Sequence, residues 1–274
     1  MNIFVIIYIL GALIAVDYCL RLIRGRGFFS HKVFHRAYWL FFFADILLLV
    51  FAFRIFLAEP FIIPSSSMVP NLLVGDYIVV SKMSYGYGQY SFPFSPFTFG
   101  GRIFGHEIKR GDVVVFRYPP NPKQTYVKRI VGLPGDTLQV KDGILFVNGA
   151  AVPRTKISDY LMDDNDQGAV SQFEENMPRQ GGTKHYRVIE VANNHGGLDN
   201  TALYTVPADH YFGMGDNRDN SADSRVLAPF GVGYIPRANI IGRVMFVLFS
   251  INKGNERNFL GWSTRWNRFF HPVK

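Results

Sequence analysis

A run of three serines, Ser65 to Ser67, offers hydroxyl groups that a hydrolase could use as a nucleophile. The run lies within residues 59–76, where three prolines hold the chain extended and exclude a long helix. Taken alone, serines in such a segment fit a polar turn better than an active site. A serine hydroxyl attacks a carbonyl only where a base removes its proton, so the segment needs a partner elsewhere in the chain.

A lysine in a strand-like segment is the candidate base. Residues 125–136 read TYVKRIVGLPGD, and alternation along a strand places Tyr126, Lys128 and Ile130 on one face. Burial among apolar neighbours disfavours the charged amine and lowers its pKa. A base that works near neutral pH needs a shift from about 10.4 to about 7–8. The competing interpretation is a solvated lysine beside Arg129 on an edge strand, and this motif alone favours that interpretation.

Two further motifs have structural explanations. Residues 110–116, RGDVVVF, are typical of a turn followed by a buried strand, and we assign no chemistry to them. Residues 214–225, MGDNRDNSADSR, are dense in side chains that hydrogen-bond to nearby backbone groups. They predict a rigid polar loop, and the loop alone does not indicate whether it orients a catalytic group.

In this order, behind two apolar segments, the four motifs closely resemble those of bacterial signal peptidase I, the membrane-bound serine protease of the Gram-negative, two-span kind. The resemblance covers nearly the whole chain and is weakest over residues 148–205. It implies an endopeptidase that removes signal peptides from exported preproteins, cutting after Ala-x-Ala-like sites. It implies no metal and no cofactor.

The resemblance also implies roles for individual residues. Ser67 is the nucleophile, Lys128 its general base, and Ser65 a side-chain donor to the oxyanion beside the backbone N–H of Ser67. Ser221 is expected to orient the lysine, and Asp223 and Arg225 form a supporting ion pair. Shallow pockets for the residues one and three positions before the cut are lined by Phe61, Ile63, Met68, Leu72 and Tyr126. Members of this family often have glycine where this chain has Ser66, which stiffens the loop.

The N-terminal quarter of the chain predicts a membrane anchor. Residues 2–22 and 37–57 each approach the roughly 20 residues that a helix needs to cross a bilayer. Arg21 at the end of the first segment and Arg24, Arg26, Lys32 and Arg36 after it form a basic loop, and basic loops stay in the cytoplasm. The sequence therefore predicts the loop inside and everything after Leu57 outside, and the resemblance implies the bacterial inner membrane with the catalytic domain on the periplasmic side. A cleaved signal peptide is disfavoured because the positive charges follow the first apolar run.

The remainder predicts a mostly β fold, an antiparallel sheet of signal-peptidase type. Short β-branched runs bounded by turns give strands at 77–81, 113–118, 125–131, 137–141, 144–147, 186–191, 204–206 and 244–249. Asp142-Gly143 and Asn148-Gly149 predict tight turns. We expect an anchor at 1–57, a catalytic core at 58–147 and 206–250, an inserted second subdomain at 148–205 and an interfacial tail at 251–274.

Charge and aromatic content favour lipid as a partner. The formal net charge is +8, and no motif supports nucleic acid binding. Residues 90–104 are crowded with aromatics, and residues 262–270 interleave aromatics with arginines, as in segments that contact lipid headgroups. Ordinary core aromatics are the alternative. The single cysteine excludes a disulfide scaffold, and nothing in the sequence indicates an oligomeric state.

The sequence also offers weaker signals for other functions. A histidine-based triad is disfavoured because His106, His185, His195 and His210 lie outside the four motifs. Asp163, Asn165, Gln167, Gly168 and Glu174 only approximate a calcium loop. Ser250 and Lys253 match S-x-x-K without its companion motifs. A self-cleaving Ser–Lys repressor would need a DNA-binding domain, and a membrane-tethered binding module would have no need of Ser67 and Lys128 together.

Overall fold

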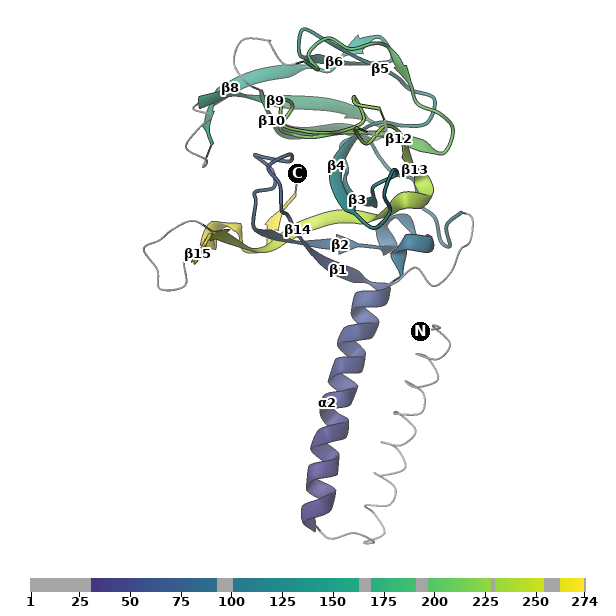
Figure 1. The fold of residues 1–274 in the computed structure, drawn as a ribbon, viewed down its shortest axis with the longest axis vertical. Coiled ribbons are helices and arrows are strands. Elements are labelled where there is room, and N and C mark those ends of the chain that lie inside the picture. Colours follow the sequence, from purple (N-terminus) through teal and green to yellow (C-terminus); the bar gives the residue numbers. More distant parts are fainter. Residues whose placement is uncertain are drawn as a thin grey trace.

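The computed structural model describes residues 31–92, 101–162, 169–190, 197–227, 230–253 and 262–273. Helix α2 (His31–Phe56) leads directly into the sheets and extends away from them (Figure 1). In the described ranges, no helix combines the length and hydropathy of a membrane span. The apolar segment predicted at residues 2–22 lies outside the described residues, whereas the one at 37–57 falls largely on α2.

The largest sheet has nine strands. Lys128 lies on one of them, and the three serines lie in the loop between two others. Its order is β1-β2-β14-β3-β4-β12-β13, with β15 and β16 pairing to β14, and every pair is antiparallel. The bounds are β1 (Ala58–Ile62), β2 (Asp76–Ser81), β3 (Val113–Arg117), β4 (Thr125–Gly132), β12 (His210–Met214), β13 (Ile235–Pro236), β14 (Ile240–Lys253), β15 (Trp262–Thr264) and β16 (His271–Pro272). Because β4 pairs on both sides, Lys128 lies in the interior of this sheet and not on its edge.

Two smaller sheets lie above the large one in Figure 1. The order β11-β5-β6-β7 comprises β5 (Thr137–Lys141), β6 (Ile144–Val147), β7 (Ala150–Ala151) and β11 (Tyr204–Thr205). The order β10-β9-β8 comprises β8 (Arg154–Leu161), β9 (Ala169–Arg179) and β10 (Gly182–Glu190). Four short 3₁₀ turns complete the described elements: η1 (Met83–Tyr85), η2 (Gln89–Ser91), η3 (Arg237–Asn239) and η4 (Trp266–Arg268).

The mostly antiparallel β fold confirms the expected class, and the eight predicted strands all fall on observed ones. The prediction missed β1, β8, β9 and β12 and the short strands β7, β13, β15 and β16. Strand β8 was not predicted because most of its side chains are exposed, so apolar and polar residues do not alternate along it. Both predicted turns have the positive φ values that tight hairpins need: 47° and 73° at Asp142 and Gly143, and 52° and 79° at Asn148 and Gly149.

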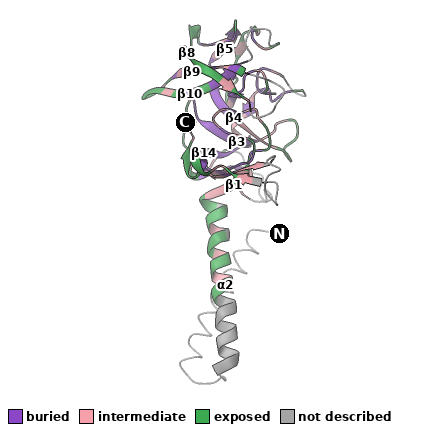
Figure 2. Ribbon diagram, turned by 90° about the vertical axis from the view of Figure 1, so that its left-hand side faces the viewer, coloured by how far each residue is buried: buried purple, intermediate pink, exposed green. Residues whose placement is uncertain are grey.

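Three clusters of buried apolar side chains hold the sheets together. One joins β1, β2, β3 and β14 to residues 63–72 and includes Ile63, Met68 and Leu72. A second joins β4, β5, β6, β10 and β12 and therefore packs the smaller sheets onto the large one. The third surrounds β3, β4 and β14 near Tyr85. The candidate catalytic strand β4 contributes to the second and third clusters, which fixes its position from both faces (Figure 2).

Candidate active site

Residues 63–76 form a closed loop after β1 that carries the three serines. The backbone N–H of Ile63 donates to the carbonyl of Asp76 at 2.9 Å, and the N–H of Gly75 donates to the carbonyl of Ile63 at 2.9 Å. Met68 is 1% exposed and anchors the loop in the core directly after Ser67. The nucleophile candidate is therefore held half-buried between a strand end and a buried side chain.

Lys128 reaches this loop from β4. It is 4% exposed, and its Nζ donates to Ser67 Oγ at 2.8 Å. Burial holds the pKa of Lys128 at about 8, below the ordinary 10.5, although the nearby carboxylates of Asp223 and Asp216 oppose the shift. The site thus brings a hydroxyl into contact with an amine that is uncharged in part of the population near neutral pH.

Ser65 lies beside the same pair. Its Oγ is 3.4 Å from Ser67 Oγ, and its side chain is exposed at the loop surface. A hydroxyl in this place can approach a group that Ser67 attacks. Its assignment as an oxyanion donor stays a prediction.

The polar loop of residues 214–225 packs against the backbone of the serine loop. The N–H of Asn217 donates to the Ser67 carbonyl at 3.1 Å. The side-chain amide of Asn217 donates to the Ser66 carbonyl at 3.3 Å, and that of Asn220 donates to Ser66 Oγ at 3.0 Å. Ser66 is thus tied by its own hydroxyl to the second loop.

Asp223 and Arg225 form the expected ion pair within this loop. Arg225 Nη2 lies 2.9 Å from Asp223 Oδ2, and both side chains are almost fully buried. The carboxylate also accepts the N–H of Gly215 at 3.0 Å, and this bond together with Arg225 keeps the pKa of Asp223 low despite burial. The two members of the pair act on Lys128 in opposite directions, since Asp223 raises its pKa and Arg225 lowers it.

Ser221 lies against the nucleophile loop through Gly215. A Cβ added at Gly215 would lie 2.3 Å from Ser221 Oγ and 2.6 Å from the Ser67 carbonyl oxygen, so only glycine allows this approach. Ser221 is 8% exposed, and its Oγ has no hydrogen-bond partner among the residues that the structure describes. A contact from Ser221 to Lys128 therefore remains a prediction, with the hydroxyl available to make it.

The comparisons with known proteins identify the family. The model of the family described as Signal peptidase, peptidase S26, matches residues 36–249. The chain belongs to this family. Signal peptidase I of Rickettsia typhi (strain ATCC VR-144 / Wilmington) is 37% identical over 212 residues, 76% of this chain and 78% of that protein. Signal peptidase I of Rickettsia akari (strain Hartford) is 36% identical over 246 residues, 84% and 90% of the two chains.

Solved structures also match this signal peptidase family member. A crystal structure of a signal peptidase I from Enterococcus faecalis V583 is 26% identical, with a TM-score of 0.29. The match covers 50% of this chain and 97% of that chain.

The structure brings together four of the five residues that were predicted to line the substrate pockets. Ile63, Met68 and Leu72 are buried in one cluster, and Phe61 packs against it. Tyr126 belongs to a different cluster, where its ring stacks on that of Tyr118 with 4.5 Å between centroids. Its neighbour Val127, which the prediction omitted, packs against the cluster that contains Ile63, Met68 and Leu72.

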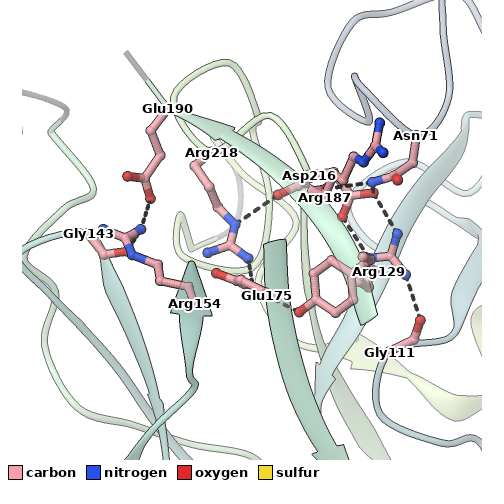
Figure 3. A network of polar contacts seen from close by, with 12 residues as sticks. Asn71, Gly111, Arg129, Gly143, Arg154, Glu175, Arg187, Glu190, Asp216 and Arg218 are labelled. Carbon is pink, nitrogen blue, oxygen red and sulfur yellow. Dashed lines mark hydrogen bonds and ion pairs between the residues drawn. The ribbon is translucent and has the colours of Figure 1, made fainter. Parts of the chain in front are cut away.

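The prediction also missed a buried ion pair on the other face of β4. Arg129 donates to both carboxylate oxygens of Asp216 at 2.7 Å and to the Gly111 carbonyl at 2.7 Å (Figure 3). The Asn71 side chain donates to the same carboxylate at 2.7 Å, and the Arg129 guanidinium lies 3.9 Å from the centroid of the Tyr186 ring. Alternation along the strand already placed Arg129 opposite Lys128, but nothing in the sequence showed which acid it meets.

Two further arginines extend this network into the smaller sheets (Figure 3). Arg218 lies 2.5 Å from Glu175 Oε2, and Tyr186 donates to the same oxygen at 2.9 Å. Arg154 lies 2.5 Å from Glu190. Arg218 thereby connects the polar loop of the site to β9, and Arg154 connects β8 to β10; of these three strands the sequence predicted only β10.

A groove of about 390 Å³ opens beside the serine loop. Ile63 and Ser66 line it together with Val69, Leu73, Tyr160, Met162, Ile251 and Arg265, among others. A smaller pocket of about 130 Å³ includes Met162, Glu190, Asn217 and Asn220. Both cavities include Met162, and the larger one reaches Ser66, whereas neither is lined by Ser67 or Lys128.

The described residues give no support to a histidine-based triad or to a metal site. His185 Nδ1 lies 2.5 Å from Asn176, and His210 Nδ1 lies 2.8 Å from the Ala208 carbonyl. No group of three or more potential metal-ligating side chains occurs in the part of the chain that is described. His195 and most of the calcium-like loop, residues 163–168, lie outside that part.

Proposed function

We propose that this member of the signal peptidase family is a membrane-anchored serine endopeptidase that removes signal peptides from exported preproteins with a Ser67–Lys128 dyad. The observation that carries the proposal is the 2.8 Å contact between Ser67 Oγ and the buried Nζ of Lys128. A solvated lysine would remain protonated and could not accept the hydroxyl proton, whereas burial supplies an uncharged amine.

The reaction proceeds by acyl transfer. Neutral Lys128 takes the proton of Ser67 Oγ as that oxygen attacks the carbonyl of the residue before the cut, and the ammonium then protonates the leaving amine. Water hydrolyses the resulting acyl-enzyme with Lys128 again as the base. Each step moves one proton between the lysine and a group at the reacting carbon, so the dyad needs no metal and no cofactor.

Two neighbouring hydroxyls complete the proposed machinery. Ser65, 3.4 Å from Ser67 Oγ, donates to the tetrahedral oxyanion together with the N–H of Ser67. Ser221 accepts a hydrogen bond from the Lys128 ammonium when its buried hydroxyl turns toward it, and the Asp223–Arg225 pair keeps this loop in place.

We assign substrate specificity to the apolar cluster around the serine loop. Side chains of Phe61, Ile63, Met68 and Leu72, with Val127 added and Tyr126 at its margin, leave shallow sites that take alanine and exclude bulky residues by contact. This matches preproteins whose signal peptides end in Ala-x-Ala.

Residues 1–57 are proposed as the anchor, with two spans in the bacterial inner membrane and the catalytic domain on the periplasmic side. Figure 2 shows α2 standing clear of the sheets with exposed surface along its described part. The large apolar side chains exposed on it are Phe42, Phe43, Ile46, Leu47, Leu49, Val50, Phe53 and Phe56. Such a helix exposes large apolar side chains on several faces, which supports lipid as its surroundings.

Two aromatic segments support contact between the catalytic domain and lipid. Trp266 and Phe270 are 76% and 67% exposed, and Phe104 is 79% exposed. We assign the core to residues 58–147 and 206–250, the inserted subdomain to 148–205 and the interfacial tail to 251–274. The tail and residues 90–104 would then rest in the headgroup region.

Cleavage of a purified preprotein with a single Ala-x-Ala site tests the function. Wild type should release one mature chain that begins directly after the second alanine, as measured by mass spectrometry. Ser67→Ala and Lys128→Ala should each abolish cleavage with an unchanged circular dichroism spectrum, and Lys128→Arg should fail because a guanidinium stays protonated.

Exposed residues of the same types provide the controls. Ser158→Ala and Lys123→Ala change side chains at the surface and should leave the rate unchanged. Cleavage by Ser67→Ala at the wild-type rate would refute the dyad. No cleavage by wild type would favour the membrane-tethered binding module.

A further inference from the structure

A lysine with a fully buried side chain lies at the junction between α2 and the large sheet. Lys82 directly follows β2, and its side chain is 0% exposed. Its Nζ lies 3.0 Å from Glu59 Oε2 and donates to the Arg54 carbonyl at 3.1 Å. The reaction proposed above uses none of these groups, so the buried cation needs another explanation.

The first part of the explanation is the end of α2, whose last carbonyls need donors from outside the helix. Lys82 supplies two of them: its Nζ bonds the Arg54 carbonyl, and its backbone N–H bonds the Leu57 carbonyl at 3.2 Å. Tyr87 Oη donates to the Phe56 carbonyl at 2.5 Å. A short stretch of the catalytic domain, residues 82–87, therefore caps the helix, and a cation is favoured there by the helix dipole.

The second part is the strand that leads to the nucleophile. Strand β1 begins directly after Leu57 and pairs with β2 from Ala58 opposite Ser81 to Ile62 opposite Tyr77. Glu59, the ion-pair partner of Lys82, is on this strand. Lys82 thus holds the helix end and the start of β1 in one contact, and the chain runs from there to Ser67 without another helix.

The ion pair is better explained by geometry than by stability. Burial lowers the pKa of Lys82, and Glu59 opposes that shift. Desolvation offsets the attraction in a buried pair, so apolar residues of similar size often stabilise a fold equally well. Contacts from Lys82 to Glu59 on β1 and to the Arg54 carbonyl on α2, in contrast, restrict the angle between helix and sheet, and Arg54 Nη2 adds a weaker contact at 3.4 Å to the same carboxylate.

We propose that Lys82 and Tyr87 are positioning residues that fix α2 against β1 and thereby set the height of Ser67 above the bilayer, which selects the bond that is cut. The inference rests on the proposed function. A change in this angle rotates the catalytic domain about the end of α2 and moves Ser67 along the bilayer normal. Because an extended substrate advances about 3.3 Å per residue, a displacement of about that size along the normal moves the cut by one residue.

The test compares full-length wild type, Lys82→Met and Tyr87→Phe in vesicles of phosphatidylethanolamine and phosphatidylglycerol. The membrane substrate is a preprotein with Ala-x-Ala-x-Ala, which offers two sites two residues apart, and mass spectrometry measures the ratio of the two mature N-termini. A soluble peptide with one Ala-x-Ala site is assayed in detergent. We expect the ratio to change at least about fivefold in each variant, while kcat/KM on the peptide stays within about twofold.

The exposed lysine variant Lys123→Met is the matched control and should leave the ratio unchanged. An unchanged ratio in the Lys82 and Tyr87 variants overturns the proposal, and so does an equal loss on both substrates, which indicates damage to the domain itself. If Lys82→Met does not fold by circular dichroism, Tyr87→Phe, which removes a single oxygen, decides alone. Failure of wild type on the soluble peptide would instead overturn the proposed function.

Discussion

Lys128 and Ser67 can exchange a proton only while the amine is uncharged, so pH is the most direct probe of the pair. Burial holds the Lys128 pKa at about 8, which leaves about a tenth of the amine neutral at pH 7 and about nine-tenths at pH 9. We expect kcat/KM on a soluble Ala-x-Ala peptide to rise about tenfold per pH unit well below 8 and to level off above it. Initial rates between pH 6 and 10 measure this, and a flat profile would contradict the dyad.

The same buried amine lowers stability over a defined pH range. The folded pKa lies at about 8, below the ordinary 10.5, so the folded state holds fewer protons between those values. Its stability therefore rises with pH in that interval, and the full penalty is present below about pH 8. Lys128→Met does not carry this penalty. The difference in free energy of unfolding between Lys128→Met and wild type should therefore shift by about 3 kcal/mol in favour of wild type from pH 7 to pH 11. Urea unfolding at both pH values measures the change, and an advantage independent of pH would argue against a buried, titrating Lys128.

Ser65 is the residue whose role is most sharply separable from folding. Its side chain is exposed, so Ser65→Ala should leave the unfolding midpoint unchanged. If its hydroxyl stabilises the oxyanion, kcat should fall by about 10²–10³ with little change in KM. Single-turnover cleavage of the peptide resolves the two parameters, with Ser158→Ala as the control. A rate close to wild type would remove Ser65 from the mechanism.

At the scale of elements, the site depends on a close approach between two loops. Gly215 contacts both the Ser67 carbonyl and Ser221 where a Cβ would stand within 2.6 Å of each. Gly215→Ala should therefore push the loops apart and lower kcat/KM by at least about 10²-fold. Gly197→Ala is the matched control, because nothing lies within 4 Å of the Cβ it would add. Equal rates in the two variants would show that the loops tolerate separation.

Sequence reasoning succeeded where local chemistry determines local structure. Asp142-Gly143 forms its turn because both residues tolerate positive φ, and β5 and β6 on either side match their predicted bounds. It failed where the partner is remote in the chain. Arg129 contacts Asp216, and Val127 packs against the cluster that contains Met68. Both contacts depend on how β4 is placed among its neighbours, and no spacing in the sequence encodes that placement.

At the scale of the whole molecule, the buried network around Arg129 joins regions that are far apart in the chain. It connects β4, the serine loop through Asn71, the polar loop through Asp216 and strand β10 through Tyr186. The opposite face of the same strand carries Lys128. The smaller sheets therefore contact, through Tyr186, the same strand that presents Lys128.

Removal of one partner from this network should be costly, because Arg129 and Asp216 are each only 1% exposed. Arg129→Met leaves a buried carboxylate without its cation and should lower the free energy of unfolding by about 3–5 kcal/mol in urea melts. Lys156→Met removes a cation from an exposed pair with Asp159 and should cost less than about 1 kcal/mol. Since the cost arises from the stranded charge, adding Asp216→Asn to Arg129→Met should recover part of the loss. A double variant no more stable than Arg129→Met alone would mean that the arginine acts through packing on Tyr186 and not through its charge.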